Sequence, residues 1–254
     1  MKKIIQIIIC FLVLFNFYNN IFAKEPIAVK TCREGVKVTQ LEGTAMALCP
    51  GQKAARCLKV SDLLQEGCEV FTGDSSRMEI VFADKTVVRF AENTNFKLIK
   101  AEATSSDKRD VKIFMSLGKI WSNVRKSLGV KGGFEISSEN AVAGVRGTVY
   151  RINVEDDKSA LIKVYDGEVN VSAPVPQKEQ KPLAIEAPKS IPGPTVIEGP
   201  KPVSMQEWIY VVRSMQQIYI KSDGKAEEPK EFTEEEDSDE WVDWNKERDN
   251  KLII

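Results

Sequence analysis

Five cysteines are the residues of this chain whose type and spacing point most directly to chemistry. One, Cys10, lies in an apolar run near the N-terminus, and the other four cluster downstream at Cys32, Cys49, Cys57 and Cys68. An even number of cysteines in one exported segment predicts two disulfides, for which three pairings exist. We favour Cys49 with Cys57, which would close a hairpin around a Pro-Gly step, and Cys32 with Cys68. The competing interpretation is a zinc site with four thiolate ligands, but zinc ribbons carry Cys-x-x-Cys pairs and this chain has none.

The chain contains no histidine. Ser-His-Asp and Cys-His hydrolases and the usual His-bearing catalytic zinc sites are therefore excluded. A two-carboxylate glycosidase, a Ser-Lys hydrolase or a carboxylate metal site would remain, but none has a recognisable signature here. The adjacent acids Asp156 and Asp157 lie in a polar stretch that is typical of a solvated loop. We therefore predict that the protein is not an enzyme and has no catalytic, cofactor-binding or metal-ligating residues.

The charge balance excludes one class of partner. Lys and Arg together number 36 and Asp and Glu 37, a formal net charge of −1, so the chain has no basic footprint for nucleic acid. Its 254 residues are enough for one β domain with a hydrophobic core and an appendage.

The N-terminus has the features of a secretory signal. Two lysines precede an apolar run over residues 4–15, and Ala23 supplies a small residue before a cleavage point. We predict a signal peptide over residues 1–23, a mature protein that starts near Lys24, and a location in the periplasm or outside the cell. The alternative is an uncleaved anchor, which would be the only contact with a membrane. An anchor needs about 20 apolar residues, and Asn16, Asn19 and Asn20 interrupt the apolar character directly after residue 15.

The elements that must position the remaining candidates are mostly strands. Two β-rich runs, 79–82 and 86–90, flank three residues, a spacing that allows only a tight hairpin. The run 161–165 leads into Asp166 and Gly167, a strong hairpin signal because glycine supplies the positive φ that the turn needs. Many short strands with regular turns predict an all-β fold, either an antiparallel sandwich or a barrel-like sheet.

Three short segments in this β region resemble a known family. They are Gly118–Trp121, Ala143–Thr148 with its Arg-Gly-Thr step, and Val164–Val169 with its Asp-Gly turn. In this order they resemble the FecR domain, an extracytoplasmic β module of bacterial cell-surface signalling proteins, over about residues 36–172. The resemblance implies an all-β domain, assigned here to residues 24–172, whose role is protein contact or ligand sensing.

FecR proteins typically have a cytoplasmic anti-sigma segment, one transmembrane helix and then the periplasmic FecR domain. Here the apolar segment begins at residue 4, so we expect no anti-sigma segment and no control of a sigma factor. We predict a secreted, non-enzymatic binding or sensing module that contacts another protein of the bacterial envelope. The alternative is a structural or carbohydrate-binding envelope component that holds a glycan on exposed aromatic residues.

Beyond the β domain, composition predicts a linker and a small, mostly helical appendage. Repeated prolines over residues 173–203 predict an extended spacer. In the appendage, residues 204–254, we predict a helix, a strand, an acidic tract and a second helix. The first helix, over about 205–214, would follow a Ser204–Glu207 capping box, the strand covers about 217–221, and the second helix, over about 233–250, starts at a Thr233–Glu236 capping box.

Three side chains are candidates for contact with a partner: Arg146, Trp241 and Trp244. Arg146 could present its guanidinium to a carboxylate or a sugar, although we favour a structural role beside a core-facing Val145. Trp241 and Trp244 share one helix face, and they either dock this helix on the β domain or anchor a partner. Trp121, by contrast, we expect in the core.

Overall fold

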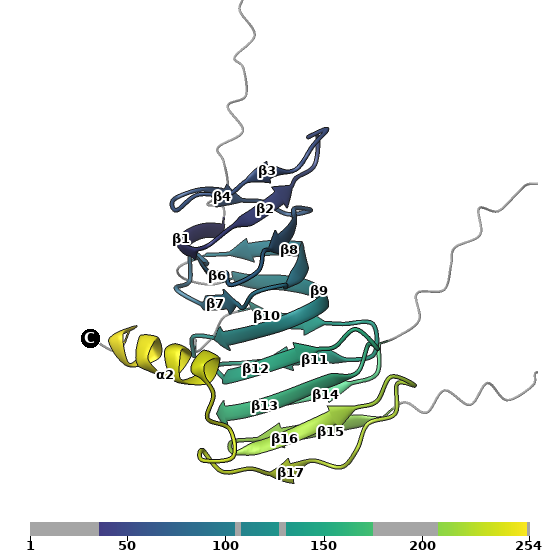
Figure 1. Ribbon diagram of the computed structural model, residues 1–254. Coiled ribbons are helices and arrows are strands. Elements are labelled where there is room, and N and C mark those ends of the chain that lie inside the picture. The colour runs from purple at the N-terminus through teal and green to yellow at the C-terminus, as the bar shows by residue number, and fades with distance from the viewer. Residues whose placement is uncertain (1–35, 105–107, 127–130, 175–207, 253–254) are drawn as a thin grey trace, which may run out of the picture. The chain divides into compact units, whose positions relative to one another are not determined.

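The computed structural model describes residues 36–104, 108–126, 131–174 and 208–252, which form two β-sheets joined by one long strand (Figure 1). We call the two sheets A and B. The long strand is β9, Lys108–Asn123; its first part pairs with strands of sheet B, and its last part pairs with strands of sheet A. The predicted signal peptide, Cys32, the Ser204–Glu207 capping box and most of the predicted linker lie outside the described residues.

Each sheet has a simple order of hydrogen-bonded neighbours. Sheet A runs β4 (Leu63–Leu64), β1 (Val36–Glu42), β6 (Arg77–Val81), β7 (Val87–Phe90), β9, β12 (Val149–Val154), β13 (Ala160–Asp166), β16 (Gln216–Ile220) and β17 (Lys230–Glu231). Sheet B runs β3 (Arg56–Cys57), β2 (Ala45–Leu48), β5 (Glu69–Thr72), β8 (Asn95–Ala103), β9, β10 (Lys131–Ser137), β11 (Val142–Val145), β14 (Glu168–Ser172) and β15 (Ile209–Arg213).

The two sheets pack face to face across one hydrophobic core. In β12, for example, Tyr150, Ile152 and Val154 are buried in this core, as the period of two along a strand requires. Phe90 of sheet A stacks on Phe96 of sheet B with ring centroids 3.7 Å apart. The predicted all-β sandwich is therefore confirmed.

Two features of the sheets differ from a purely antiparallel sandwich or a barrel. β9 and β10 pair in parallel, whereas the other strand pairs are antiparallel, so the sheet system is mixed. Among the described residues, the outermost strands of both sheets pair on one side only. The sheets are thus open, and no barrel closes.

Gly118 allows β9 to leave one sheet and enter the other. Its φ is +104°, and a Cβ atom there would lie 2.6 Å from the Cα of Thr94, so a larger residue would collide with backbone. Leu117, before it, pairs with Asn95 of sheet B, and Ile120, after it, pairs with Phe90 of sheet A.

The two predicted hairpins have different outcomes. The hairpin between the runs 79–82 and 86–90 is confirmed, because β6 and β7 pair antiparallel. The hairpin at Asp166 and Gly167 is wrong: β13 belongs to sheet A and β14 to sheet B. Gly167, with φ +88°, turns the chain from one sheet to the other. The same local turn signal fits either a hairpin or a corner, and only the partners of each strand decide between them.

The C-terminal part extends both sheets before it forms a helix. The helix predicted over about 205–214 is wrong, because Ile209–Arg213 forms β15 and pairs with β14. This run is rich in β-branched and aromatic residues, which favour a pleated strand once a neighbour is present. The short strand predicted at 217–221 is confirmed as β16. The final helix, α2 (Glu240–Leu252), is also present but starts at Glu240 instead of near Thr233.

Candidate functional site

A row of polar and aromatic side chains crosses the outer face of sheet A. Consecutive members sit directly opposite one another on neighbouring strands. Because side chains alternate along a strand, the row points away from the core, yet every member is buried. We call it the polar row, and it consists of Glu79 (β6), Arg89 (β7), Trp121 (β9), Arg151 (β12) and Lys163 (β13).

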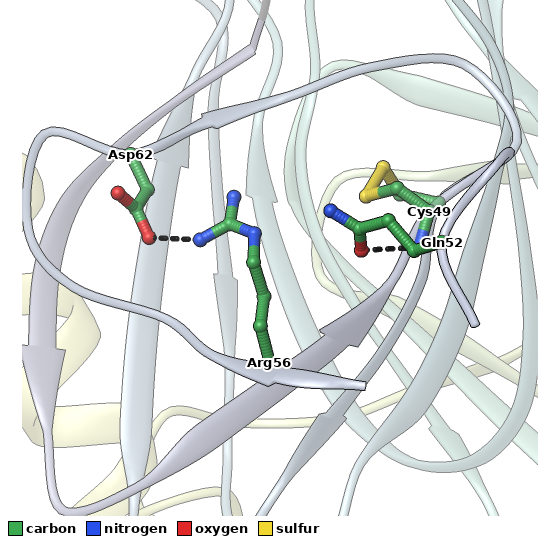
Figure 2. The surroundings of a disulfide bond; sticks show 5 residues. Cys49, Gln52, Arg56 and Asp62 are labelled. Atoms are coloured by element: carbon green, nitrogen blue, oxygen red, sulfur yellow. Dashed lines mark hydrogen bonds and ion pairs between the residues drawn. A yellow bond between two sulfur atoms is a disulfide. The ribbon is translucent and has the colours of Figure 1, made fainter. Parts of the chain in front are cut away.

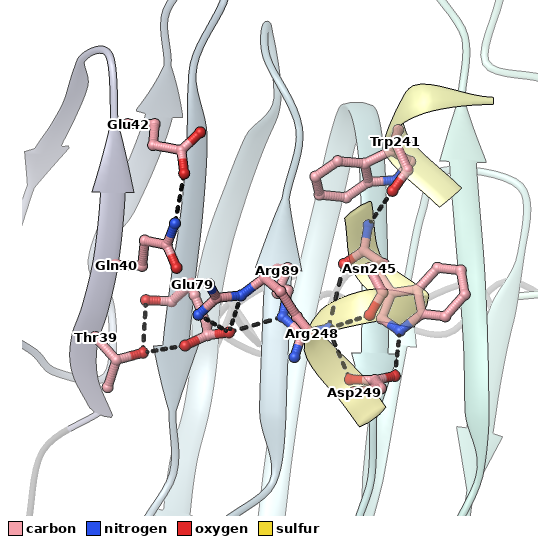
Figure 3. Close-up of polar contacts among 10 residues, drawn as sticks. Thr39, Gln40, Glu42, Glu79, Arg89, Trp241, Asn245, Arg248 and Asp249 are labelled. Atoms are coloured by element: carbon pink, nitrogen blue, oxygen red, sulfur yellow. Dashed lines mark hydrogen bonds and ion pairs between the residues drawn. The ribbon is translucent and has the colours of Figure 1, made fainter. Parts of the chain in front are cut away.

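The C-terminal segment covers the polar row. Residues 232–252, which we call the arm, follow β17 and end with α2. They bind the row through Asp237 and, as Figure 3 shows, through Asn245, Arg248 and Asp249. Outward-facing charged residues are normally hydrated, so burial of this set requires partners on the covering segment. The arm supplies those partners.

The sequence of the arm explains its path. The predicted capping box is present, with Thr233 N donating to Glu236 Oε2 at 2.9 Å and Glu236 N donating to Thr233 Oγ1 at 3.3 Å. It closes one turn only, because α2 has its own cap: Val242 N donates to Asp239 Oδ1 at 2.7 Å. The break between the two caps leaves Asp237 outside the helix, where its carboxylate reaches sheet A.

Asp237 binds two cations and a phenol at one end of the row. Its Oδ1 accepts hydrogen bonds from Lys163 Nζ at 2.9 Å and from Arg151 Nη2, and its Oδ2 accepts one from the hydroxyl of Tyr165. Arg151 also donates from Nη1 to Asn153 Oδ1 at 2.9 Å. The side chains of Asp237, Arg151 and Lys163 are each less than 10% exposed, so this is a buried ionic cluster.

Arg89 is the centre of a second buried ionic cluster (Figure 3). It donates from Nε to Glu79 Oε2 and from Nη1 to Asp249 Oδ1, both at 2.7 Å. The other oxygen of Asp249 accepts from Trp121 Nε1 at 2.9 Å, and Arg248 donates to Glu79 at 3.1 Å. The carboxylate at the end of α2 therefore bridges the two central members of the row.

Both tryptophans of the arm pack against the sheet. Trp241 is 6% exposed and belongs to a small apolar cluster with Ala91, Trp121 and Val242, separate from the main core. Trp244 is half-buried and stacks on Trp241 with centroids 5.4 Å apart. Three guanidinium groups, those of Arg77, Arg89 and Arg248, lie within 6 Å of the Trp244 ring centroid. The sequence left open whether these tryptophans dock the helix on the β domain or anchor a partner, and in the structure the helix is docked.

Two buried carboxyl groups of the site, those of Asp237 and Glu79, have lowered pKa values. Burial raises the pKa of Asp237, but hydrogen bonds from Arg151, Tyr165 and Lys163 outweigh burial, and the pKa lies below its ordinary value. Burial likewise raises the pKa of Glu79, and the hydrogen bonds from Arg89 and Thr39 outweigh it in the same way. Both groups are therefore held in the charged form at neutral pH.

The fit between arm and row is incomplete at two atoms. Arg89 Nη2 and Trp241 Nε1 are fully buried and have no hydrogen-bond partner. A buried donor without an acceptor costs about 1–3 kcal/mol relative to one that is satisfied. The arm therefore binds this face without using all of its hydrogen-bonding capacity.

The disulfide in the structure corrects the predicted pairing. Cys49 is bonded to Cys68, not to Cys57, and the preferred pairing of Cys32 with Cys68 is therefore wrong as well. Cys49 directly follows β2 and Cys68 directly precedes β5, and the antiparallel pairing of these strands brings the two residues together. Gln52 Oε1 accepts from Cys49 N beside the bond (Figure 2). Cys57 is exposed and has no disulfide partner among the described residues, which do not include Cys32.

The other candidates from the sequence lie apart from the polar row. Arg146 is exposed in the turn between β11 and β12, beside the buried Val145. Asp156 and Asp157 lie in the exposed turn between β12 and β13, where Ser159 N donates to Asp157 Oδ1 at 2.9 Å. In the part of the chain that the structure describes, no group of three or more Cys, Asp or Glu side chains is placed to hold a metal ion.

The sequence reasoning located two tryptophans of the site but missed the polar row. A signal was available, because Glu79, Arg89 and Arg151 each lie between two apolar or aromatic residues in a strand. Such residues are ordinarily assigned to a solvated face. Only the acidic arm at the far end of the chain gives them buried partners.

Comparison with known proteins identifies the class of this domain. A family model described as FecR protein matches residues 69–170, which include the whole polar row but not the arm. Residues 69–170 therefore match a FecR domain, and the predicted resemblance is confirmed. The match fits a regulatory domain with a sensing or protein-contact role. No curated protein matches the chain.

Two solved structures are also similar to this chain. They are crystal structures, at 1.65 and 2.50 Å resolution, of a protein assigned as an anti-sigma factor from Parabacteroides distasonis ATCC 8503. Each is 19% identical with a TM-score of 0.44, and the match covers 64% of this chain. This chain spans 59% of the length of those structures. Among the described residues, no helix is both long enough and apolar enough to cross a membrane.

Proposed function

We propose that this protein is an exported FecR-domain protein of the bacterial envelope that works by binding another protein and has no catalytic activity of its own. The polar row carries this proposal. It is a face that holds a polypeptide segment through two buried ionic clusters and an aromatic contact, which is the chemistry of a protein-binding surface.

Export is supported by the Cys49–Cys68 disulfide, because disulfides persist in oxidising compartments such as the periplasm. The predicted signal peptide over residues 1–23 agrees with this location. Protein contact is favoured over glycan binding because all four tryptophans lie within the described residues and none is exposed. The exposed aromatic residues of the described part, Phe71 and Phe114 of sheet B and Tyr219 of sheet A, make no ring contact with one another. A sugar platform needs an open aromatic face.

The test is cross-linking in the native envelope. A photo-reactive amino acid is placed at Arg77, which binds Glu240 beside the polar row, at the candidate Arg146 and, as a control, at Asp156, and fractions are then probed for adducts. We expect an envelope protein to be captured and the mature chain to lack residues 1–23 by intact-mass analysis. Retention of the chain in the cytoplasm, or binding to a glycan array without any protein adduct, would contradict the proposal.

A further inference from the structure

The arm is added to a pair of sheets whose main core is complete without it. The main core contains buried residues from both sheets but none from residues 232–252. Trp241, Val242 and Trp244 of the arm instead join the small separate cluster around Trp121. The remaining contacts are mostly ion pairs and hydrogen bonds, which water can replace when the arm leaves. The arm thus resembles a bound ligand more than a core element.

The charges of the two surfaces are complementary in sign. The sheet side is mainly cationic, whereas the arm is mainly anionic at the contact points. The sheet contributes Arg77, Arg89, Arg151 and Lys163 with one carboxylate, Glu79, and the arm contributes Asp237, Glu240 and Asp249 with one cation, Arg248. A segment that competes for this face must therefore be acidic.

The incomplete fit indicates that another segment could satisfy the face better. Arg89 is 0% exposed, and its Nη2 atom has no acceptor, although Nη1 of the same guanidinium binds the arm at Asn245 and Asp249. Trp241 also leaves its indole N–H without a partner in the same interface. A ligand with one more acceptor at Arg89 would gain a charge-assisted hydrogen bond that the arm does not make.

We propose that the arm is the resident, exchangeable occupant of the polar row, and that the partner is an acidic helix bearing a tryptophan, presented by another protein. This inference rests on the proposed function and adds the chemistry of the partner and the place where it binds. The tethered arm competes with the partner, so binding requires displacement of the arm. The face is thereby closed to weak acidic ligands and open to a segment that fits better than the arm.

The test uses the full chain and a labelled synthetic peptide of residues 232–252 as the probe. An arm-released chain, Asp237→Asn with Asp249→Asn, keeps the polar row intact but weakens the resident arm. We expect the peptide to bind the arm-released chain at least about tenfold more tightly than the parent, because a tethered competitor acts at an effective concentration near the millimolar range. A peptide with the same two substitutions should not bind, and Arg151→Gln in the arm-released chain should abolish binding.

Equal binding of the peptide to the parent and arm-released chains, or equal binding of both peptides, would overturn the inference. So would a concentration-dependent dimer in which copies exchange their arms, since the partner would then be a second copy. Folding of each variant is checked by circular dichroism. If the arm-released chain does not fold, hydrogen exchange on the parent decides: α2 amides should exchange well before those of β7 and β9. If the amide hydrogens of α2, β7 and β9 all exchange only when the whole protein unfolds, the arm does not leave the sheet by itself and the inference is refuted.

The two proposals fail in different experiments. Peptide binding without any envelope adduct would contradict the proposed function but keep the exchange of the arm. Envelope adducts without peptide binding would keep the proposed function and overturn the exchange.

Discussion

Removal of the charge on Asp237, a residue of the arm, should strongly destabilise the protein. In Asp237→Asn the side chain keeps its size, but Arg151 and Lys163 lose the carboxylate that neutralises both of them. The new amide also places N–H donors against these cations. Breaking a buried ion pair by removing one partner costs about 3–5 kcal/mol, because the other charge stays buried.

Release of the arm limits this cost. If residues 232–252 leave the sheet, Arg151 and Lys163 become hydrated and the penalty cannot exceed the docking free energy of the arm. We therefore expect the lower end of the range, a loss of about 3 kcal/mol, which corresponds to a Tm decrease of about 6–12 °C for a domain of this size.

The measurement is urea denaturation followed by tryptophan fluorescence and circular dichroism, with the parent and Asp156→Asn as references. Asp156 is exposed in a turn, so its substitution should change the free energy of unfolding by less than about 0.5 kcal/mol. Fluorescence from the arm should become solvent-like at lower urea than the loss of β signal. A loss for Asp237→Asn below about 1 kcal/mol would refute the buried cluster as described.

Three further predictions follow from the same contacts. Trp241→Ala truncates a large buried aromatic residue, and because release of the arm limits this cost as well, it should lower the free energy of unfolding by about 3 kcal/mol in urea titrations; an unchanged midpoint would show that the arm is not docked. The pKa values of Asp237 and Glu79 are lowered in the folded state. Their contribution to the stability of the fold is therefore complete above their ordinary pKa values of 3.8 and 4.5, and it is lost as the pH falls through the lowered pKa values. Thermal unfolding measured from pH 7 to pH 2 should therefore show a Tm that falls below about pH 4.5, and the fall should be smaller in Asp237→Asn than in the parent. Equal falls in both proteins would show that Asp237 is not the source of the acid sensitivity. With the observed disulfide assigned, we predict a second one between Cys32 and Cys57, which non-reducing peptide mapping of the exported protein should detect; a free thiol at Cys57 would contradict it.

Much of the fold was accessible from the sequence because its signals are local. The run 79–90 alternates and turns within a dozen residues, so the β6–β7 hairpin was predicted correctly. The helix at Trp241 was predicted from the acidic residues at its start and the basic residues at its end, whereas the Thr233–Glu236 capping box closes a separate turn and placed the start too early. Local propensity failed at Ile209–Arg213, where apolar residues fit a helix face as well as a strand, and pairing with β14 decided the outcome.

The sequence by itself determined the β content, the C-terminal helix and the resemblance to FecR domains, since each depends on residues close together in the chain. Only the tertiary structure decided which charges are buried. Asp249 reaches Arg89 across 160 positions, and Asp237 reaches Arg151 across 86. The same is true of Cys49, whose partner is set by the register of β2 on β5. The free energy of a buried charge depends on what covers it, and a strand pattern does not contain that information.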